Sequence, residues 1–281
     1  MSETIGAAPD SLEANSPFEL RVDRSAGAPE SFIKKSLETG DVGFIHSFTT
    51  GSAVDGPGVR VVAWTAGCLW RCRYCHNPDT WSMINGMGVP LDRAVAEVSK
   101  YRRGLSVMGG GFTLSGGEPL MQDRFAVRLL AATKAMGVHT AIETNGFLGD
   151  RLSDAELDQI DLVLLGIKAW GADRHRSLTG KDLEPTLQFA RRLAERKKPV
   201  WVRFVLVPGL TDDEGTLNPI AEFAAGLGNV GRVEVLPFHQ MGRYKWEKLG
   251  LDYTLADARA PTAEEAERAC AVFRARGLEA Y

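Results

Sequence analysis

The chain has 281 residues, 44% of them hydrophobic and 25% charged, which is the balance of a globular protein large enough to bury a core without disulfides. Its formal net charge of −3 argues against a general nucleic-acid binder, and no apolar run approaches the ~20 residues that a membrane span requires. The polar N-terminus carries no secretory signal pattern, so we expect a cytoplasmic protein.

The first forty residues differ in texture from the rest of the chain. Residues 1–40 are rich in Ser, Glu, Ala, Pro and Gly and lack apolar periodicity, which predicts a mostly disordered N-terminal extension. We expect a single domain to cover residues 41–281.

Beyond the extension, short apolar runs alternate with segments of helical periodicity. Strands are predicted at 44–49, 59–65, 112–114, 138–142, 162–167, 200–207 and 233–236. Helices are predicted at 91–101, 122–136, 154–159, 183–196, 213–227 and 262–276, and a long loop at 242–261. This alternation predicts βαβ units with a parallel sheet, and its length suits a full or partial barrel better than two domains.

Polar residues lie in or after the carboxyl-terminal parts of five consecutive predicted strands. They are Ser115 to Glu118, Glu143 to Asn145, Lys168, Arg203 and His239. Because ligands bind at the carboxyl ends of strands in parallel α/β folds, these residues predict one shared site. Solvated loop starts in any α/β protein would give a similar pattern.

The cysteines are concentrated on one predicted loop. Cys68, Cys72 and Cys75 have the spacing C-x3-C-x2-C directly after an apolar strand, whereas Cys270 stands alone on a predicted helix and is interpreted as a buried, inert thiol. Three thiolates on one short loop can hold three corners of an iron–sulfur cube. The fourth iron would then stay open to a small-molecule ligand.

A zinc site made by Cys68, Cys72, Cys75 and His76 is the alternative. Zinc takes four tetrahedral ligands, and the adjacent positions of Cys75 and His76 are awkward for one ion. A non-catalytic, zinc-stabilised binding module nevertheless remains open as a function of another class.

The cysteine loop, with the aromatic Tyr74 between its last two cysteines, resembles that of the radical S-adenosylmethionine (SAM) superfamily. The resemblance implies a partial (β/α)6 TIM-like barrel and a [4Fe–4S] cluster on three cysteines, whose open iron chelates SAM. It also implies reductive cleavage of SAM to a 5′-deoxyadenosyl radical, with the cofactors carrying the chemistry.

Further segments resemble the glycyl-radical-enzyme activases of that superfamily. They lie at 55–60 and 75–81, on either side of the cluster ligands, and at 109–111, 144–147, 201–203, 207–209, 236–239 and 245–246. There is no additional cysteine between His76 and Ser115, as in the activases that act on pyruvate formate-lyase. The resemblance therefore implies that this chain generates a glycyl radical on pyruvate formate-lyase, the alternative being another glycyl-radical enzyme.

The resemblance also implies residue roles. The residues expected to bind SAM are Tyr74, Cys75 and His76 on the cluster loop, Gly116, Gly117 and Glu118 at its amino group, Glu143 and Thr144, and Lys168, Arg203 and His239 on the adenosyl side. Asp55 is expected to help seat the glycine loop of the partner.

One departure concerns a monovalent cation near SAM. The family often has aspartates at the positions that Glu143 and Gly166 occupy here. Because Gly166 offers only a backbone carbonyl, we predict a weakened or altered cation site.

The implied electron donor is a flavodoxin-type protein. Arg71, Arg73, Arg102 and Arg103 are predicted to form a basic patch for this acidic donor. We expect the chain itself to be a monomer.

Overall fold

The structure, a computed structural model, describes residues 29–281, so the predicted disorder of residues 1–28 lies outside the described part of the chain. Glu30–Thr39, which was predicted to belong to the same extension, instead forms helix α1, and Gly40 ends it at a φ of 67°. The prediction was wrong there because it rested on the composition of residues 1–40 as a whole, whereas α1 packs against α4 and β1 with Ser36 buried, and such packing stabilises a helix.

One eight-stranded sheet forms the centre of the molecule, in the order β3-β1-β2-β4-β5-β6-β7-β8. Its strands are β1 (Val42–Ser52), β2 (Arg60–Thr65), β3 (Met87–Pro90), β4 (Gly111–Gly116), β5 (His139–Thr144), β6 (Leu162–Gly166), β7 (Val200–Leu206) and β8 (Val230–Pro237). β2 and β4 to β8 are parallel, whereas β1 pairs antiparallel with both β2 and β3.

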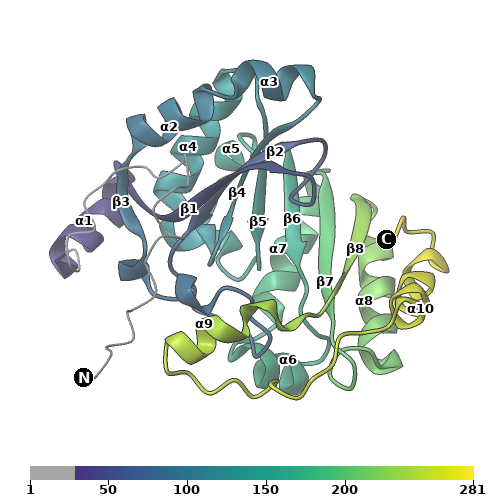
Figure 1. Cartoon of the computed structure of the whole chain (residues 1–281). Helices are drawn as coiled ribbons and strands as arrows, with labels where there is room; N and C mark the ends of the chain where they lie inside the picture. The colour runs from purple at the N-terminus through teal and green to yellow at the C-terminus, as the bar shows by residue number, and fades with distance from the viewer. Residues whose placement is uncertain (1–28) are drawn as a thin grey trace, which may run out of the picture.

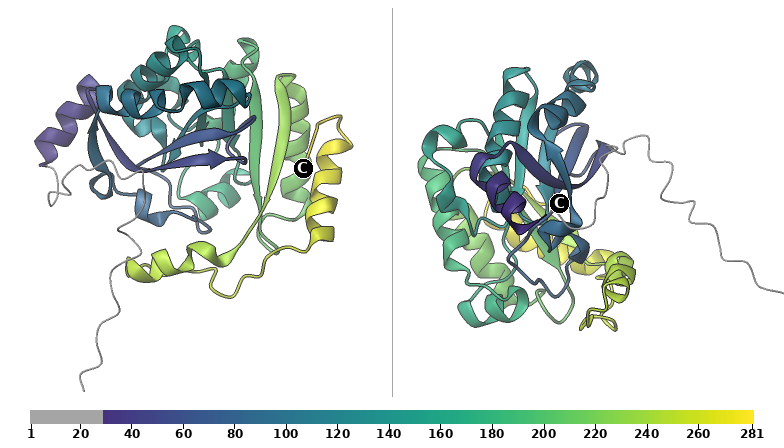
Figure 2. Two further views of the ribbon diagram at one scale, coloured as in Figure 1. Left: turned by 45° about the horizontal axis from the view of Figure 1, so that its top comes forward. Right: turned by 90° about the vertical axis from the view of Figure 1, so that its left-hand side faces the viewer.

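The helices after α1 flank the curved sheet and are α2 (Leu91–Ser99), α3 (Arg102–Val107), α4 (Asp123–Ala135), α5 (Asp154–Leu157), α6 (Ala172–Thr179), α7 (Glu184–Glu195), α8 (Glu214–Leu227), α9 (Arg243–Lys248) and α10 (Ala263–Arg274). Most helices cover the outer side of the sheet (Figures 1 and 2), whereas α3 lies at its top edge and α6 and α9 at its bottom edge in the view of Figure 1. Short 3-10 turns are η1 (Pro78–Thr80), η2 (Met83–Asn85), η3 (Pro119–Gln122), η4 (Gly149–Arg151) and η5 (Gln240–Gly242).

These elements confirm the predicted α/β class and the partial barrel, which is an open, curved sheet. All seven predicted strands and all six predicted helices are present, with ends shifted by a few residues. The sequence reading missed β3, α3 and α6, and it was wrong to treat 242–261 as a loop throughout, because α9 lies there. Among residues 29–281, no helix is both long and apolar enough to cross a membrane.

The parallel strands give the molecule two distinct edges. The cluster loop follows the carboxyl end of β2, and α6 follows that of β6, at the bottom of Figure 1. Helix α3 precedes β4 and lies at the opposite, amino edge, at the top of the same view. Glu118, Asn145, Lys168 and His239, which come after strands, therefore gather at the lower edge, whereas Ser115, Glu143 and Arg203 lie inside β4, β5 and β7.

Candidate functional site

The cysteine loop is anchored on both sides by backbone hydrogen bonds. Gly67 N donates to Thr80 O at 2.7 Å, which joins the start of the loop to the segment that follows it. On the other side Arg71 N donates to Thr179 O at 2.8 Å, at the end of α6. The loop is thus fixed between β2 and α6, at the carboxyl edge of the sheet.

All three loop cysteines are free thiols and partly buried. Burial raises the pKa of each thiol, to about 12 for Cys72, and the neighbouring thiolates raise the pKa values of Cys68 and Cys72 further. Such thiols ionise and become ligands beside a strongly cationic partner, and three of them on one loop fit three corners of an iron–sulfur cluster. Among residues 29–281, no three His, Cys, Asp or Glu side chains come close enough to hold a single metal ion, as the zinc alternative would require.

The glycine-rich segment after β4 lies against the cysteine loop. A Cβ atom on Gly117 would lie 2.4 Å from Gly67 O, so only glycine permits this approach. Gly116 has a φ of 121°, and Glu118 N donates to Gly67 O at 2.8 Å. The backbone of the segment thereby borders the loop that carries the cysteines.

The Glu118 carboxylate is buried and fully engaged by protein donors. Oε1 accepts hydrogen bonds from Leu120 N at 3.0 Å and Thr144 Oγ1 at 2.7 Å, and Oε2 accepts one from Asn145 N at 2.8 Å. Burial raises the pKa of Glu118, although these hydrogen bonds oppose the shift. Glu118 and Thr144, both predicted site residues, together join the carboxyl ends of β4 and β5.

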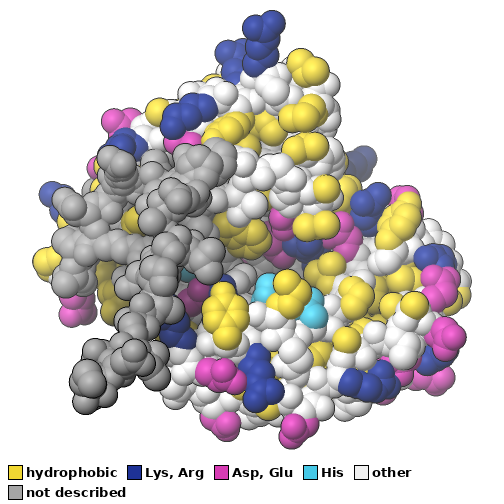
Figure 3. Space-filling view, viewed as in Figure 1, with side chains coloured by type: hydrophobic (Ala, Val, Ile, Leu, Met, Phe, Trp, Pro, Cys, Tyr) yellow, Lys and Arg dark blue, Asp and Glu magenta, His cyan; other side chains and the backbone are white. Residues whose placement is uncertain are grey.

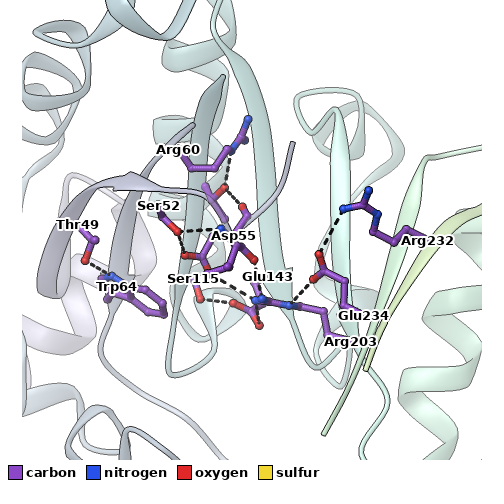
Figure 4. A network of polar contacts seen from close by, with 12 residues as sticks. Thr49, Ser52, Asp55, Arg60, Trp64, Ser115, Glu143, Arg203, Arg232 and Glu234 are labelled. Atoms are coloured by element: carbon purple, nitrogen blue, oxygen red, sulfur yellow. Dashed lines mark hydrogen bonds and ion pairs between the residues drawn. The ribbon is translucent and has the colours of Figure 1, made fainter. Parts of the chain in front are cut away.

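Arg203 on β7 lies at the centre of a buried ionic network (Figure 4). Its Nη1 is 2.8 Å from Glu143 Oε1 and 3.4 Å from Asp55 Oδ1, and its Nε is 2.9 Å from Glu234 Oε2 as an ion pair without hydrogen-bond alignment. The other Glu143 oxygen accepts a hydrogen bond from Ser115 Oγ at 2.6 Å. The Arg203 guanidinium is thus the counter-charge of three carboxylates.

The carboxylates of this network titrate differently. Burial would raise the pKa of Glu143, but Arg203, Ser115 and Lys168 outweigh it and hold that pKa below its usual value. Burial does raise the pKa values of Asp55 and Glu234, and the charge of Arg203 offsets this only in part. Figure 3 shows acidic and basic side chains in the hollow in the middle of this face, with histidine side chains below them.

The residues expected near a monovalent cation do not fit one. Both Glu143 oxygens are already engaged, by Arg203 and by Ser115. A Cβ atom on Gly166 would lie 2.8 Å from Lys168 Nζ, so an ammonium group occupies the space of the missing side chain. Positive charge from the chain itself already stands where a cation would bind.

Four further predicted residues lie on the cysteine loop or near it. The rings of His76 and His239 meet edge to face, with centroids 4.6 Å apart. Lys168 Nζ makes no hydrogen bond or ion pair with any residue that the structure describes. Tyr74 is buried, and its hydroxyl finds no partner within residues 29–281, so its ring packs beneath the loop.

Sequence reasoning missed two members of the ionic network, Ser52 and Glu234. Ser52 Oγ donates to Asp55, and Glu234 reaches Arg203 from β8. Glu234 stands opposite Arg203 in the register of β7 and β8. The only sequence signal for Glu234 was that it is a charged residue inside a predicted apolar strand.

The predicted basic patch is not one surface. Arg71 and Arg73 lie on the cysteine loop at the carboxyl edge of the sheet, whereas Arg102 and Arg103 belong to α3 at the amino edge (Figure 1). The prediction was wrong because a helix that precedes a parallel strand lies at the opposite edge from a loop that follows one.

Comparison with known proteins shows the family to which the chain belongs. The model of the radical SAM superfamily matches residues 62–218. The chain is 41% identical over 229 residues to the pyruvate formate-lyase 1-activating enzyme of Escherichia coli strain K12, covering 81% of this chain and 93% of that protein. It is 44% identical over 234 residues to the pyruvate formate-lyase-activating enzyme of Staphylococcus epidermidis, with the same coverage.

A solved structure is similar as well. It is a domain of a pyruvate-formate lyase-activating enzyme from Bacteroides vulgatus, 25% identical, with a TM-score of 0.50. The match covers 62% of this chain and 98% of that domain.

Proposed function

Since the chain belongs to the pyruvate formate-lyase-activating branch of the radical SAM superfamily, we infer that it activates pyruvate formate-lyase by generating a glycyl radical on it. Its cofactors are a [4Fe–4S] cluster and SAM. When bound, they supply a one-electron reductive cleavage that yields a 5′-deoxyadenosyl radical, the species that takes the hydrogen atom of the glycine. The alternative of a non-catalytic zinc module is therefore wrong.

We propose that Cys68, Cys72 and Cys75 are the cluster ligands. The observation that carries this proposal is the grouping of three free, partly buried thiols on one loop at the carboxyl edge of the sheet. A fourth cysteine, Cys270, is buried on α10 and lies outside the loop. Three thiolates leave one iron open for the amino acid end of SAM.

The backbone of the glycine-rich segment is proposed to receive the SAM amino group. Gly117 brings the backbone of the segment against Gly67 at the start of the cysteine loop, and Gly116 packs as closely on Thr65, so no side chain lies between the backbone and the loop. Glu118 supports them indirectly, because both its oxygens already accept hydrogen bonds from protein groups. Cys75 and His76 would contact SAM from the loop, above the buried ring of Tyr74.

Cationic and imidazole groups are proposed to line the rest of the SAM site. Lys168 offers an unpaired ammonium to a carboxylate, and His239 stands beside His76. Arg203 acts on Glu143 and on Asp55, whose loop we assign to the glycine of the partner.

We propose a flavodoxin-type electron donor, a monomeric enzyme and a cytoplasmic location. The cytoplasm suits the protein because closely spaced thiols stay reduced there. A monomer would leave the hollow of Figure 3 open for the partner's loop.

The function is tested by mixing the anaerobically reconstituted protein with pyruvate formate-lyase, SAM and dithionite. We expect the EPR signal of a glycyl radical and the appearance of lyase activity. The Cys72→Ser variant should give neither, whereas Cys270→Ala, a change of one cysteine outside the loop, should behave as the wild type. Cleavage of SAM without a radical on the lyase would point to a different glycyl-radical enzyme as the partner.

A further inference from the structure

The segment after β8 turns back and covers the outer side of the cysteine loop (Figure 1). It comprises η5 and α9, which the structure forms at residues 240–248. A Cβ atom on Gly242 would lie 2.6 Å from His76 O, so the two backbones touch. Segments far apart in the sequence therefore meet next to the third cysteine.

Trp246 on α9 makes the most direct contact with a cluster ligand. Its Nε1 donates a hydrogen bond to Cys75 O at 2.9 Å, and the side chain is buried. The ring also meets Trp81 edge to face, with centroids 5.0 Å apart. Trp246 thus fixes the backbone of Cys75 and packs against Trp81, the last residue of the segment 75–81.

Lys245, the residue before Trp246, contacts Asn77 and Asp79, which follow the third cysteine. Its Nζ donates to Asn77 Oδ1 at 2.7 Å and lies 3.0 Å from Asp79 Oδ2. Asp79 is in turn 3.2 Å from His46 Nε2 on β1. The lysine therefore connects the loop to the rest of the protein through an ion pair that is largely shielded from solvent.

The other contacts that hold residues 75–79 are few: His46 on β1 meets Asp79, Asn85 Nδ2 donates to Asp79 O at 2.8 Å, and the His76 ring meets that of His239. The backbone hydrogen bonds of residues 75–79 stay within the loop, such as Cys75 N to Cys72 O at 3.0 Å and Thr80 N to Asn77 O at 3.0 Å. The long-range hydrogen bonds of this stretch come from side chains, and those of Lys245 and Trp246 join it to α9 at Cys75, Asn77 and Asp79. A stretch that loses these contacts has to be ordered when a ligand binds, and the ordering free energy subtracts from affinity.

We propose that Lys245 and Trp246 are positioning residues, which hold residues 75–79 in the conformation that receives SAM beside the cluster. The proposal rests on the inferred function, because it assigns Cys75 and His76 to the SAM site. Neither residue touches the reacting atoms, and neither is a catalytic residue. They act through the backbone of Cys75 and the side chains of Asn77 and Asp79.

The test compares single substitutions in the reconstituted holoenzyme. Trp246→Phe keeps a buried ring and removes the N–H donor, and Lys245→Met removes the charge. Each should retain full iron content, since all three thiols remain. Each should bind SAM about three- to tenfold more weakly, the factor for one lost hydrogen bond, and SAM should perturb the EPR spectrum of the reduced cluster less.

Two variants serve as controls. Trp201→Phe changes a tryptophan on β7 whose ring stacks on Arg232 at 4.4 Å, away from the loop. It should leave the SAM dissociation constant and the EPR spectrum unchanged. Lys245→Arg keeps the charge and should restore most of the affinity that Lys245→Met loses.

Wild-type SAM affinity and an unchanged EPR response in both Trp246→Phe and Lys245→Met would overturn the proposal, as would an equal effect of Trp201→Phe. These readouts need no pyruvate formate-lyase. A failure of the wild type to form a glycyl radical would therefore count against the inferred function, while the positioning role is judged separately.

Discussion

At the scale of single residues, Arg203 determines the electrostatics of the site. Three carboxylates from β5, β8 and the loop before β2 converge on it, and it is only 6% exposed. Buried carboxylates without a counter-charge are costly, so the guanidinium is what allows them to lie together. The sequence predicted Arg203 and Glu143 as site residues, but not that they bind each other. Their pairing depends on strand register, which no local pattern encodes.

Removal of Arg203 should destabilise the fold. For Arg203→Met we expect the free energy of unfolding of the apoprotein in urea to fall by about 3 to 5 kcal/mol, because buried charges lose their partner. Arg203→Lys should lose less, since it keeps the charge but not the forked geometry. Arg176→Met, which breaks an exposed pair with Asp182, should cost about 1 kcal/mol or less. Equal losses for Arg203→Met and Arg176→Met would contradict the assigned network.

The same residues predict how the enzyme responds to potassium. Because Lys168 and Arg203 already place positive charge beside Gly166 and Glu143, SAM cleavage should not depend on a monovalent cation. We expect equal rates of 5′-deoxyadenosine release in potassium chloride and in a tetraalkylammonium salt of the same ionic strength. Stimulation by potassium alone would show that a cation site exists after all.

At the scale of elements, strong periodicity was sufficient to predict the sheet and most of its helices. Continuous apolar runs identified strands such as β6, which is buried along its whole length. Short elements were not predicted, because tertiary contacts stabilise them and their sequences are too short to show a clear periodicity. Helix α9 has six residues and is held by Trp246, which contacts Cys75, 171 positions away in the sequence, and Trp81.

Helix α10 begins with a capping box that can be tested. The Thr262 side chain accepts a hydrogen bond from Glu265 N, and the Glu265 side chain accepts one from Thr262 N. Thr262→Ala should lower the free energy of unfolding by about 1 kcal/mol in urea titrations. Ser177→Ala, at an exposed position inside α6, should change it by less than about 0.5 kcal/mol. If both variants had the same stability, the cap would contribute nothing.

At the scale of the whole molecule, the open barrel separates two edges with different functions. The carboxyl edge carries the cysteine loop, the glycine-rich segment and α9, whereas α3 lies at the amino edge (Figure 1). Composition and motif order predicted the class and the position of the site. They could not show that Arg71 and Arg73 would lie at the opposite edge from Arg102 and Arg103.

This separation refines the expected docking of the electron donor. Reversing charge at Arg71 and Arg73 should slow cluster reduction by flavodoxin and leave reduction by dithionite unchanged, because only the protein donor needs an electrostatic surface. The same reversal at Arg102 and Arg103 should affect neither reaction. Stopped-flow absorbance of the cluster measures both rates. If reduction by dithionite also became slower, the substitutions would have damaged the loop, because Arg71 Nη1 donates a hydrogen bond to Cys68 O at 2.7 Å.

The central claim is that this chain takes a hydrogen atom from a glycine of its partner by way of SAM. It is tested most directly with pyruvate formate-lyase that carries α-deuterated glycine. Mass spectrometry of the 5′-deoxyadenosine formed should find deuterium in it, in proportion to the glycyl radical seen by EPR. Unlabelled 5′-deoxyadenosine accompanying a full radical signal would contradict the claim.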